Sequence, residues 1–349
     1  MFKLFAETAP PTWFARPLEK EKSHENCHHP QSRYVLGYRS RHSLPSEFRS
    51  SKEISGHHQR SPHRQLQGTD FGNVYGKALA EAGFVVIAFD RSFQGASGGE
   101  PRSIEDPTQS VEDFRRVTDY LMTLPYVDGE RVGLLGICGG GGYAISATMT
   151  ERRIKALGTV VAANYGRLMR GNFSGLHPVD ALEKMANQRT AEIRGAKLQV
   201  DDLLPPSVEA GKKAGITDID VLEATDYYRT PRGQKPNGLN RSMPSHQAAA
   251  VGWDAFLQAE VLLTQPMCIV VGDKPGAFGS YRDGCEIVER AASKDKELVV
   301  AEGWSHYDLY DKPEPVKIAL DRLIPFYTRV LGTVEATATV DQKVGRQAA

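Results

Sequence analysis

Short apolar runs separated by polar stretches dominate the hydrophobic pattern of this chain. The runs cover residues 84–89, 132–135, 154–162, 266–272 and 297–301, with Lys155 and Glu297 as the charged exceptions. Continuous apolar runs of this length are typical of parallel strands that are buried on both faces of a sheet. The pattern therefore predicts that each run forms a buried strand.

Segments with apolar residues every three or four positions alternate with these runs. They cover residues 74–82, 110–124, 143–149, 284–293 and 315–331. This spacing places apolar side chains on one face of a helix. Alternating helices and buried strands predict an α/β protein with a mostly parallel, doubly wound sheet. We assign residues 69–163 and 264–332 to this core.

The segment at residues 164–263 separates two predicted strands. It contains proline-rich breaks and helical pieces at 208–213, 224–228 and 248–263. It is too long for a plain connection between strands. We interpret it as a helical cap insertion over the active site; the alternative is a second domain with no role there.

The ends of the chain have a different composition. Residues 1–68 are rich in Ser, His, Arg and Pro and show no sustained periodicity. Such a polar segment buries too little apolar surface to offset the entropy lost on ordering. We predict a disordered or atypical segment there, with 34–38 as a weak strand candidate. The polar tail at 333–349 is also predicted to be disordered.

A glycine-rich stretch at residues 136–143 (GICGGGGY) follows the strand at 132–135. Strand, sharp glycine turn, reactive side chain and helix form the pattern of a nucleophile elbow. Its centre is usually Ser; here it is Cys138. The N–H of Gly139 and the following helix would favour a thiolate and then an oxyanion. A phosphate loop or a plain packing turn is the alternative, but G-x-G-x-x-G is absent.

Two further reactive residues follow predicted strands: Asp273 and His306. With Cys138 they form the order nucleophile, acid, histidine. A histidine can take the proton of the thiol, and a carboxylate behind it can fix the tautomer. Asp283 and Asp308 are alternatives for the acid. His177 and His246, the other histidines outside residues 1–68, do not follow a predicted strand.

The overall composition narrows the function classes. Lys+Arg and Asp+Glu balance at 43 each, so the charge does not indicate nucleic acid or an anionic membrane. No apolar run reaches the roughly 18 residues of a membrane-spanning helix, and no signal peptide is recognisable. Four scattered cysteines do not form a disulfide framework, which favours a reducing, cytoplasmic setting. A histidine and cysteine cluster at 24–29 is only a weak metal candidate.

Several motifs together resemble those of a known family. They are YGKALAEAGFVVIAFDRSFQGASGGEPR at 75–102, GICGGGGYA at 136–144, YYRTPRGQ at 227–234, VVGDKPGAFGSYRDG at 270–284 and EGWSHYDLYD at 302–311. This set resembles the dienelactone-hydrolase-like branch of the α/β-hydrolases, which includes the fungal polyketide transferases. The resemblance implies a triad of Cys138, Asp273 and His306 with no metal or organic cofactor.

The N-terminal part departs from that resemblance. Family members have several strands before the first helix, and the loop that follows them supplies a second oxyanion N–H. Here that position holds residues 65–72 (QLQGTDFG), with no HGGG-like run. The N-terminal strands are therefore expected to be missing or replaced.

The expected function is hydrolysis or acyl transfer on a small ester, lactone or thioester through an acyl-enzyme on Cys138. The alternative is a catalytically impaired homologue that acts as a binding or interaction protein. The expected partner is a small-molecule acyl substrate, without nucleic acid or membrane, and a homodimer is left open.

Overall fold

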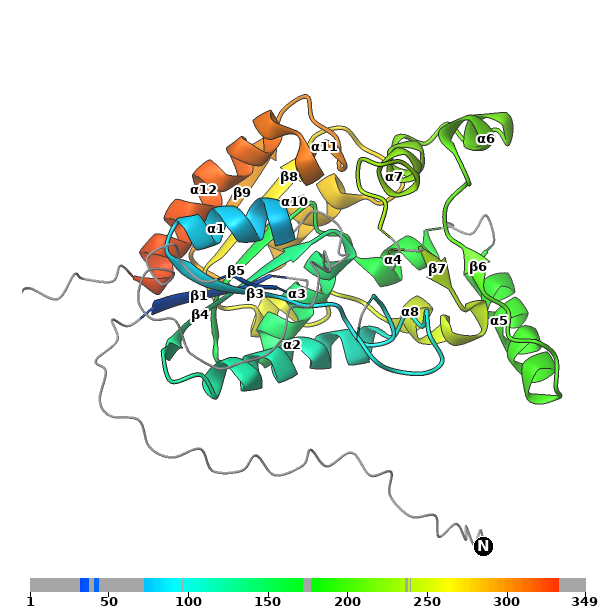
Figure 1. Ribbon diagram of the computed structural model, residues 1–349, viewed down its shortest axis with the longest axis horizontal. Helices are drawn as coiled ribbons and strands as arrows, with labels where there is room; N and C mark the ends of the chain where they lie inside the picture. The colour runs from blue at the N-terminus through cyan, green and yellow to red at the C-terminus, as the bar shows by residue number, and fades with distance from the viewer. Residues whose placement is uncertain are drawn as a thin grey trace, which may run out of the picture.

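A seven-stranded sheet forms the middle layer of the molecule (Figure 1). The computed structural model describes residues 74–95, 97–171, 177–235, 238 and 240–332, and the backbone of 32–37, 41–43 and 72–73. The strand order is β2-β3-β1-β4-β5-β8-β9, and every pair is parallel except β2 with β3. The mostly parallel sheet predicted from the apolar runs is confirmed. The strands are β1 (Ser32–Gly37), β2 (Arg41–Ser43), β3 (Phe84–Ala88), β4 (Val127–Ile137), β5 (Ile154–Val160), β8 (Met267–Gly272) and β9 (Lys296–Ala301).

Helices cover both faces of the sheet. One face packs against α1 (Lys77–Glu81), which follows the π-helical turn η2 (Gly72–Gly76), and against α12 (Pro313–Leu331). The other face packs against α2 (Pro107–Met122), α3 (Gly139–Thr150) and α10 (Ser280–Arg290). Successive side chains of β4 point to opposite faces of the sheet. Leu135 and Ile137 therefore belong to the hydrophobic cluster on the side of α1 and α12, the first core cluster. Leu134 belongs to the cluster on the side of α2, α3 and α10, the second core cluster.

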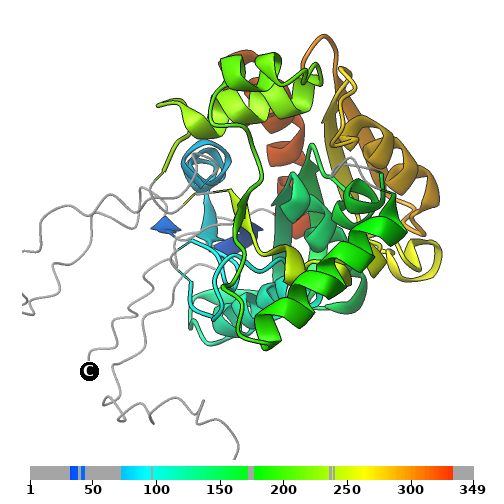
Figure 2. The same cartoon turned by 90° about the vertical axis from the view of Figure 1, so that its right-hand side faces the viewer.

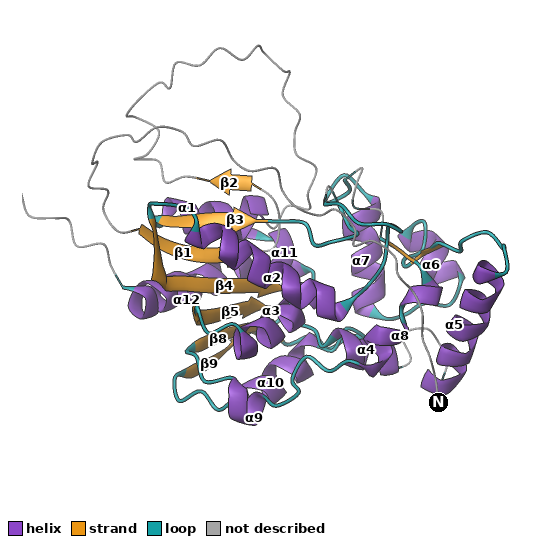
Figure 3. Ribbon diagram, turned by 90° about the horizontal axis from the view of Figure 1, so that it is seen from below, coloured by secondary structure: helices purple, strands orange, loops and turns teal. Residues whose placement is uncertain are grey.

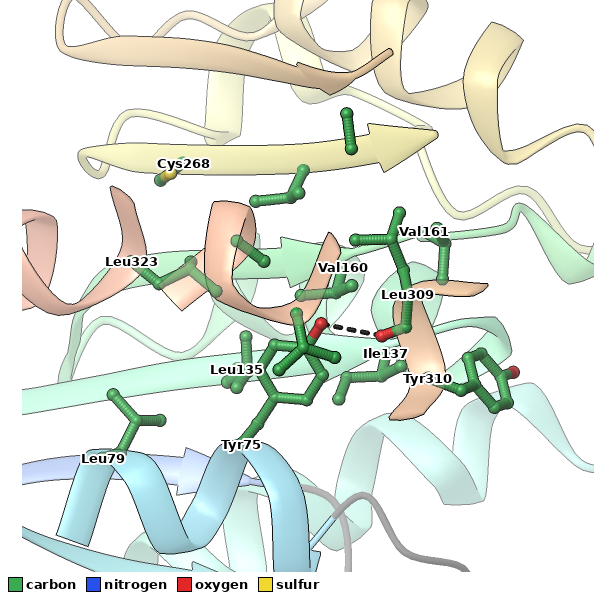
Figure 4. Packing of buried hydrophobic residues seen from close by; sticks show 14 of the residues in the cluster. Tyr75, Leu79, Leu135, Ile137, Val160, Val161, Cys268, Leu309, Tyr310 and Leu323 are labelled. Carbon is green, nitrogen blue, oxygen red and sulfur yellow. Dashed lines mark hydrogen bonds between the residues drawn. The ribbon is translucent and has the colours of Figure 1, made fainter. Parts of the chain in front are cut away.

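The first core cluster is tied together by a buried hydrogen bond (Figure 4). The hydroxyl of Tyr75 donates to the carbonyl oxygen of Leu309 at 2.7 Å. Leu309 lies in α11 (Asp308–Asp311), the short helix after β9. The bond therefore connects the first helical turn of the described core with the segment that follows the last strand.

The N-terminal segment contributes two strands, which revises the prediction for residues 1–68. β1 lies between β3 and β4, with Val35 beside both Val86 and Gly133. β2 lies at the sheet edge, antiparallel to β3. The sheet is therefore not left open between β3 and β4, and the weak strand candidate at 34–38 corresponds to β1. The predicted disorder of the rest of 1–68, like that of 333–349, falls outside the described residues.

Two helices differ in extent from the sequence prediction, one at the glycine run and one where a side chain accepts a hydrogen bond from the backbone. Helix α3 begins at Gly139, earlier than the predicted start at 143. The single helix predicted at 248–263 is two helices, α8 (Ala248–Gly252) and α9 (Ala259–Leu262). Asp254 interrupts it, because its carboxylate accepts a hydrogen bond from the N–H of Phe256 at 2.9 Å.

The insertion after β5 lies beyond the carboxyl ends of the parallel strands (Figure 3). Figure 2 views the molecule from this side. The segment is mainly helical, as predicted, but it also contains a two-stranded antiparallel sheet. Its last part belongs to the core, where Ala255, Phe256 and Ala259 are buried. The elements are α4 (Tyr165–Arg170), α5 (Pro178–Ile193), β6 (Asp201–Asp202), α6 (Val208–Lys213), α7 (Ile219–Arg229), β7 (Arg241–Ser242), η3 (Pro244–His246), α8 and α9.

Among the described residues, no helix has both the length and the apolar character that a membrane span requires.

Candidate active site

Cys138 lies at the turn between β4 and α3, as the elbow motif predicts. Its backbone has φ 55° and ψ −133°, a conformation that few residues with a side chain adopt. Backbone hydrogen bonds hold it there. Its N–H donates to the carbonyl of Val160 at 3.1 Å, and its carbonyl accepts from Gly141 at 2.8 Å and Ala163 at 3.0 Å. The surrounding backbone therefore fixes a strained residue at the carboxyl edge of the sheet.

The glycines around Cys138 allow α3 to lie very close to the strands. A Cβ on Gly136 would lie 2.5 Å from the Cβ of Ala144. A Cβ on Gly141 would lie 2.5 Å from the Cβ of Ala162. Real Cβ atoms do not approach that closely, so these positions require glycine. The glycine run therefore allows the turn that carries Cys138 to pack closely against its neighbours.

A cavity of about 260 Å³ opens above Cys138. Its walls come from loops at the carboxyl ends of the strands and from the insertion. Ligand sites in open α/β sheets lie at this edge. The insertion supplies apolar residues to the wall of this cavity. The aromatic lining consists of Tyr143, Tyr165, Tyr228, Phe278, Tyr307 and Tyr310, and the apolar lining from the cap includes Leu168, Leu203 and Leu204.

A buried ion pair lies in the wall of this cavity. Arg91 pairs with Glu105, and Glu105 also accepts a hydrogen bond from the hydroxyl of Tyr143. The guanidinium of Arg91 lies 5.7 Å from the centroid of the Tyr143 ring. Sequence reasoning missed this group. The sequence signal that could have found it is the glycine-rich loop that begins with Arg91, after the strand at 84–89.

Burial raises the pKa of the Cys138 thiol above its ordinary value. Two hydrogen bonds act in the opposite direction, one from the hydroxyl of Tyr310 and one from the N–H of Gly139. Both donors stabilise a thiolate but do not outweigh its loss of hydration. Cys138 therefore rests as a neutral thiol near pH 7, and catalysis requires a base to remove its proton.

His306 is almost completely buried, in the turn between β9 and α11. Its Nδ1 lies 3.1 Å from the Oγ of Ser280, and its Nε2 lies 3.4 Å from the hydroxyl of Tyr310. Burial lowers the pKa of His306 to about 3, so the imidazole is neutral at rest. The structure therefore brings His306 and Cys138 into one neighbourhood through Tyr310.

The three candidate acids occupy different positions. Asp273 accepts a hydrogen bond from the N–H of Gly303 at 2.7 Å, in the turn that leads to His306. Asp283 is buried and pairs with Arg167 at 2.7 Å. Asp308 accepts from the N–H of Ser305 at 3.1 Å and so supports the local turn. Within the described ranges, none of these carboxylates has a hydrogen bond to His306.

The remaining candidate residues lie away from the thiol. His177 accepts a hydrogen bond from Val179 at the start of α5, and His246 contacts Ser245. The part of the chain that the structure describes contains no His, Cys, Asp and Glu group suited to a metal ion. The weak metal candidate at residues 24–29 lies outside that part.

Comparison with known proteins decides the family. A family model described as "Serine aminopeptidase, S33" matches residues 70–313, well over half of the chain. The chain belongs to the α/β-hydrolase superfamily. The resemblance inferred from the motifs is confirmed, although this hydrolase has Cys138 at the position where the elbow usually has serine.

Relatives of this hydrolase include proteins with and without a named activity. The uncharacterized protein YcjY of Escherichia coli is 40% identical over 74% of this chain and 83% of its own length. Two fungal relatives match shorter stretches. Thiohydrolase aneE of Aspergillus aculeatus is 33% identical over 42% of this chain and 45% of its own length. Polyketide transferase claH of Penicillium crustosum is 26% identical over 34% of this chain and 38% of its own length.

A solved structure shares the fold. The crystal structure of hypothetical protein PA2218 from Pseudomonas aeruginosa is 25% identical, with a TM-score of 0.68. The match covers 88% of this chain and 87% of that chain. The two chains therefore share the same fold over most of their lengths.

The cap of this hydrolase holds the loop beside His306 through a buried carboxylate. Asp220, near the start of α7, accepts a hydrogen bond from the N–H of Phe278 at 2.8 Å. The ring of Phe278 packs edge-on against His306, with the ring centroids 5.4 Å apart. The other carboxylate oxygen, Oδ1, is buried without a hydrogen-bond partner among the described residues. Burial raises the pKa of Asp220 to about 7.

We expect Asp220→Asn to stabilise the hydrolase more strongly at pH 8 than at pH 5. Between about pH 4 and pH 7 the folded state keeps a proton on Asp220 that the unfolded state has lost. The free energy of unfolding therefore falls by roughly 2–4 kcal/mol as the pH rises through this range. Asparagine at position 220 does not ionise, so it removes this loss. Thermal melts at both pH values measure the difference.

Asp218→Asn is the matched control for this prediction. Asp218 caps α7 by accepting from the N–H of Val221 at 3.1 Å, and also accepts from Ala277 at 2.9 Å. Asparagine is an equally good N-cap but has one acceptor oxygen in place of two, so Asp218→Asn should lose the hydrogen bond to Ala277 at both pH values alike. An Asp220→Asn melting difference that is the same at pH 5 and pH 8 would contradict the buried-carboxylate explanation.

Proposed function

We propose that this α/β-hydrolase acts on an ester, lactone or thioester through an acyl intermediate on Cys138. The observation that carries the proposal is the strained Cys138, held at φ 55° in the wall of a cavity and directly before Gly139, the first residue of α3. A nucleophile presented in this way, beside a backbone donor at a helix start, suits acyl transfer.

In this proposal the sulfur of Cys138 attacks the carbonyl carbon of the substrate. The N–H of Gly139 stabilises the resulting oxyanion. His306 accepts the thiol proton and returns it to the leaving group. Asp273 acts as a positioning residue, because it holds the Gly303 turn that carries His306. The loop expected to supply a second oxyanion N–H, residues 65–72, lies almost entirely outside the described residues.

The cap favours a small acyl compound with an apolar portion. Leu168, Leu203 and Leu204 provide apolar surface above the thiol, and aromatic rings line the remaining walls. Relatives named as a thiohydrolase and a polyketide transferase support thioester and polyketide acyl groups as substrates. Water or an alcohol would then release the acyl group. We place this chemistry in a reducing cytoplasm, which would keep the thiol free.

Trapping of the intermediate tests the proposal. Incubation with p-nitrophenyl acetate, followed by acid quenching and mass spectrometry, is expected to show one acetyl group on the peptide that carries Cys138. Cys285→Ala is the control, because Cys285 is a half-buried cysteine on α10 and should leave the labelling unchanged. Acetylation of other residues with none on Cys138 would exclude the acyl-enzyme.

A binding function without turnover is the second candidate. It is favoured by the absence of a direct Cys138–His306 hydrogen bond among the described contacts, and by Ser280 rather than a carboxylate at Nδ1. In that case a thiol-reactive acyl probe should label Cys138 no faster than Cys285, although the protein melts cooperatively. Preferential labelling of Cys138 would favour the enzyme.

A further inference from the structure

Tyr310 lies between the proposed nucleophile and the proposed base. Its hydroxyl lies 3.4 Å from Nε2 of His306. Tyr310 and Cys138 line the same cavity, and the Tyr310 hydroxyl acts to lower the pKa of the Cys138 thiol. Tyr310 is completely buried, and its hydroxyl extends away from the core cluster that contains Leu309 (Figure 4). One hydroxyl group therefore lies within reach of His306 and in the same cavity wall as Cys138.

Packing fixes the Tyr310 ring in this position. The ring lies 4.4 Å from that of Tyr307 and 5.1 Å from that of Tyr227, measured between centroids. It also lies 5.5 Å from the imidazole of His306. Rings held on several sides lose little further freedom when the hydroxyl forms its hydrogen bonds. The hydroxyl is thus already oriented before substrate arrives.

We propose that the hydroxyl of Tyr310 relays the proton from Cys138 to His306, an inference that rests on the proposed function. The S–H bond of Cys138 breaks, and its proton forms a new bond to the Tyr310 oxygen. At the same time the original O–H proton of Tyr310 moves to Nε2 of His306. The products are a thiolate, a neutral tyrosine and an imidazolium. After the thiolate has attacked, the Nε2–H bond of the imidazolium breaks and its proton forms a bond to the leaving group, which regenerates the neutral imidazole.

The hydrogen bonds around His306 fit this relay. A neutral imidazole with its proton on Nδ1 donates to the Oγ of Ser280, 3.1 Å away, and leaves Nε2 free to accept. After the transfer, the Tyr310 hydroxyl donates to the thiolate and Nε2–H donates to Tyr310. Ser280, the first residue of α10, is therefore a positioning residue that holds the required tautomer.

A double-mutant cycle with Tyr310→Phe and His306→Gln tests the relay. Each variant alone should slow acylation of Cys138 by p-nitrophenyl acetate by about 10²-fold, since each removes one link of general-base catalysis. The double variant should be no slower than the slower single variant, because the relay fails once any link is lost. Tyr281→Phe is the matched control, since Tyr281 is exposed on α10 and should retain the wild-type rate.

Two results would overturn the relay. One is a Tyr310→Phe rate equal to that of Tyr281→Phe, which would show that the hydroxyl only packs. The other is losses that multiply in the double variant, which would show that Tyr310 and His306 act independently. Phenylalanine preserves the ring packing, and thermal melts verify that each variant is folded.

A proton inventory on the unaltered protein provides a second measurement. The pre-steady-state acylation rate is followed in mixtures of H₂O and D₂O. Two protons move in the relay, so the rate should curve as the D₂O fraction rises. A linear dependence, typical of one proton in flight, would overturn the relay without any variant.

Alkylation of Cys138 by iodoacetamide separates this inference from the proposed function. Alkylation requires the thiolate but no acyl chemistry. Tyr310→Phe should shift the pH profile of alkylation upward, because the thiolate loses a hydrogen-bond donor. Suppose that Cys138 is not acylated, but Tyr310→Phe still shifts the pH profile of alkylation and the effects of Tyr310→Phe and His306→Gln on the alkylation rate are still non-additive. The proposed function then fails and the relay stands. If Cys138 is acylated and neither effect appears, only the relay fails.

Discussion

Turnover of p-nitrophenyl acetate is expected to fall by about 10⁴-fold or more when Cys138 is replaced by alanine. The thiol is the only nucleophile that the elbow presents, so its loss removes the covalent route. The remaining cavity and the Gly139 N–H can bind the ester but cannot form the acyl-enzyme. Initial rates measured at saturating ester give the ratio directly.

Two further variants make this result specific to the elbow. Cys285→Ala removes a half-buried thiol on α10 and should leave turnover within about twofold of wild type. Cys138→Ser keeps a nucleophile of the same geometry, but its hydroxyl is harder to deprotonate, so intermediate activity is expected. Equal rates for wild type and Cys138→Ala would remove the triad interpretation.

A large loss of stability is expected when Gly141 is replaced by alanine. The new Cβ would lie 2.5 Å from the Cβ of Ala162 and 2.7 Å from its Cα. Neither segment can move freely, because the Cys138 carbonyl binds the N–H of Gly141 and that of Ala163. Forcing a methyl group into such a contact costs about 3 kcal/mol or more. Urea unfolding measures the change in the free energy of unfolding.

Gly139→Ala is the matched control in the same helical turn. Its Cβ would meet nothing closer than Cδ2 of Tyr165 at 3.9 Å. Alanine in place of glycine within a helix stabilises by roughly 0.5–1 kcal/mol. The two substitutions should therefore change the free energy of unfolding in opposite directions. Equal stability of Gly141→Ala and wild type would show that α3 does not pack as tightly on β5 as described.

Burial of Cys138 and His306 determines the protonation state of the resting thiol. Burial raises the pKa of Cys138 and lowers that of His306, so a preformed thiolate–imidazolium pair is disfavoured before substrate binds. This resting state resembles the neutral hydroxyl–imidazole pair of serine hydrolases more than an activated thiolate. The hydrolase would consequently tolerate oxidants better than enzymes with an exposed, ionised cysteine.

Most of the core elements could be predicted from the sequence because their signals are local. Buried parallel strands show as apolar runs, and the helices beside them show as apolar stripes with a period near 3.6. The predicted strand at 154–162 corresponds to β5, and the predicted helix at 315–331 corresponds to α12. β1 was only a weak candidate, because a run of three apolar residues between polar neighbours does not define a period. Its place is set by hydrogen bonds to β3 and β4 on both sides.

By itself, the sequence determined the elbow with Cys138 and the order of Cys138, Asp273 and His306 at strand ends, because glycine turns and strand ends are properties of neighbouring residues. Only the tertiary structure decided which groups meet. It placed Tyr310 between Cys138 and His306, Ser280 at Nδ1, and Asp273 on Gly303. These contacts depend on how separate loops pack at one sheet edge, and such packing leaves no periodic pattern in the chain.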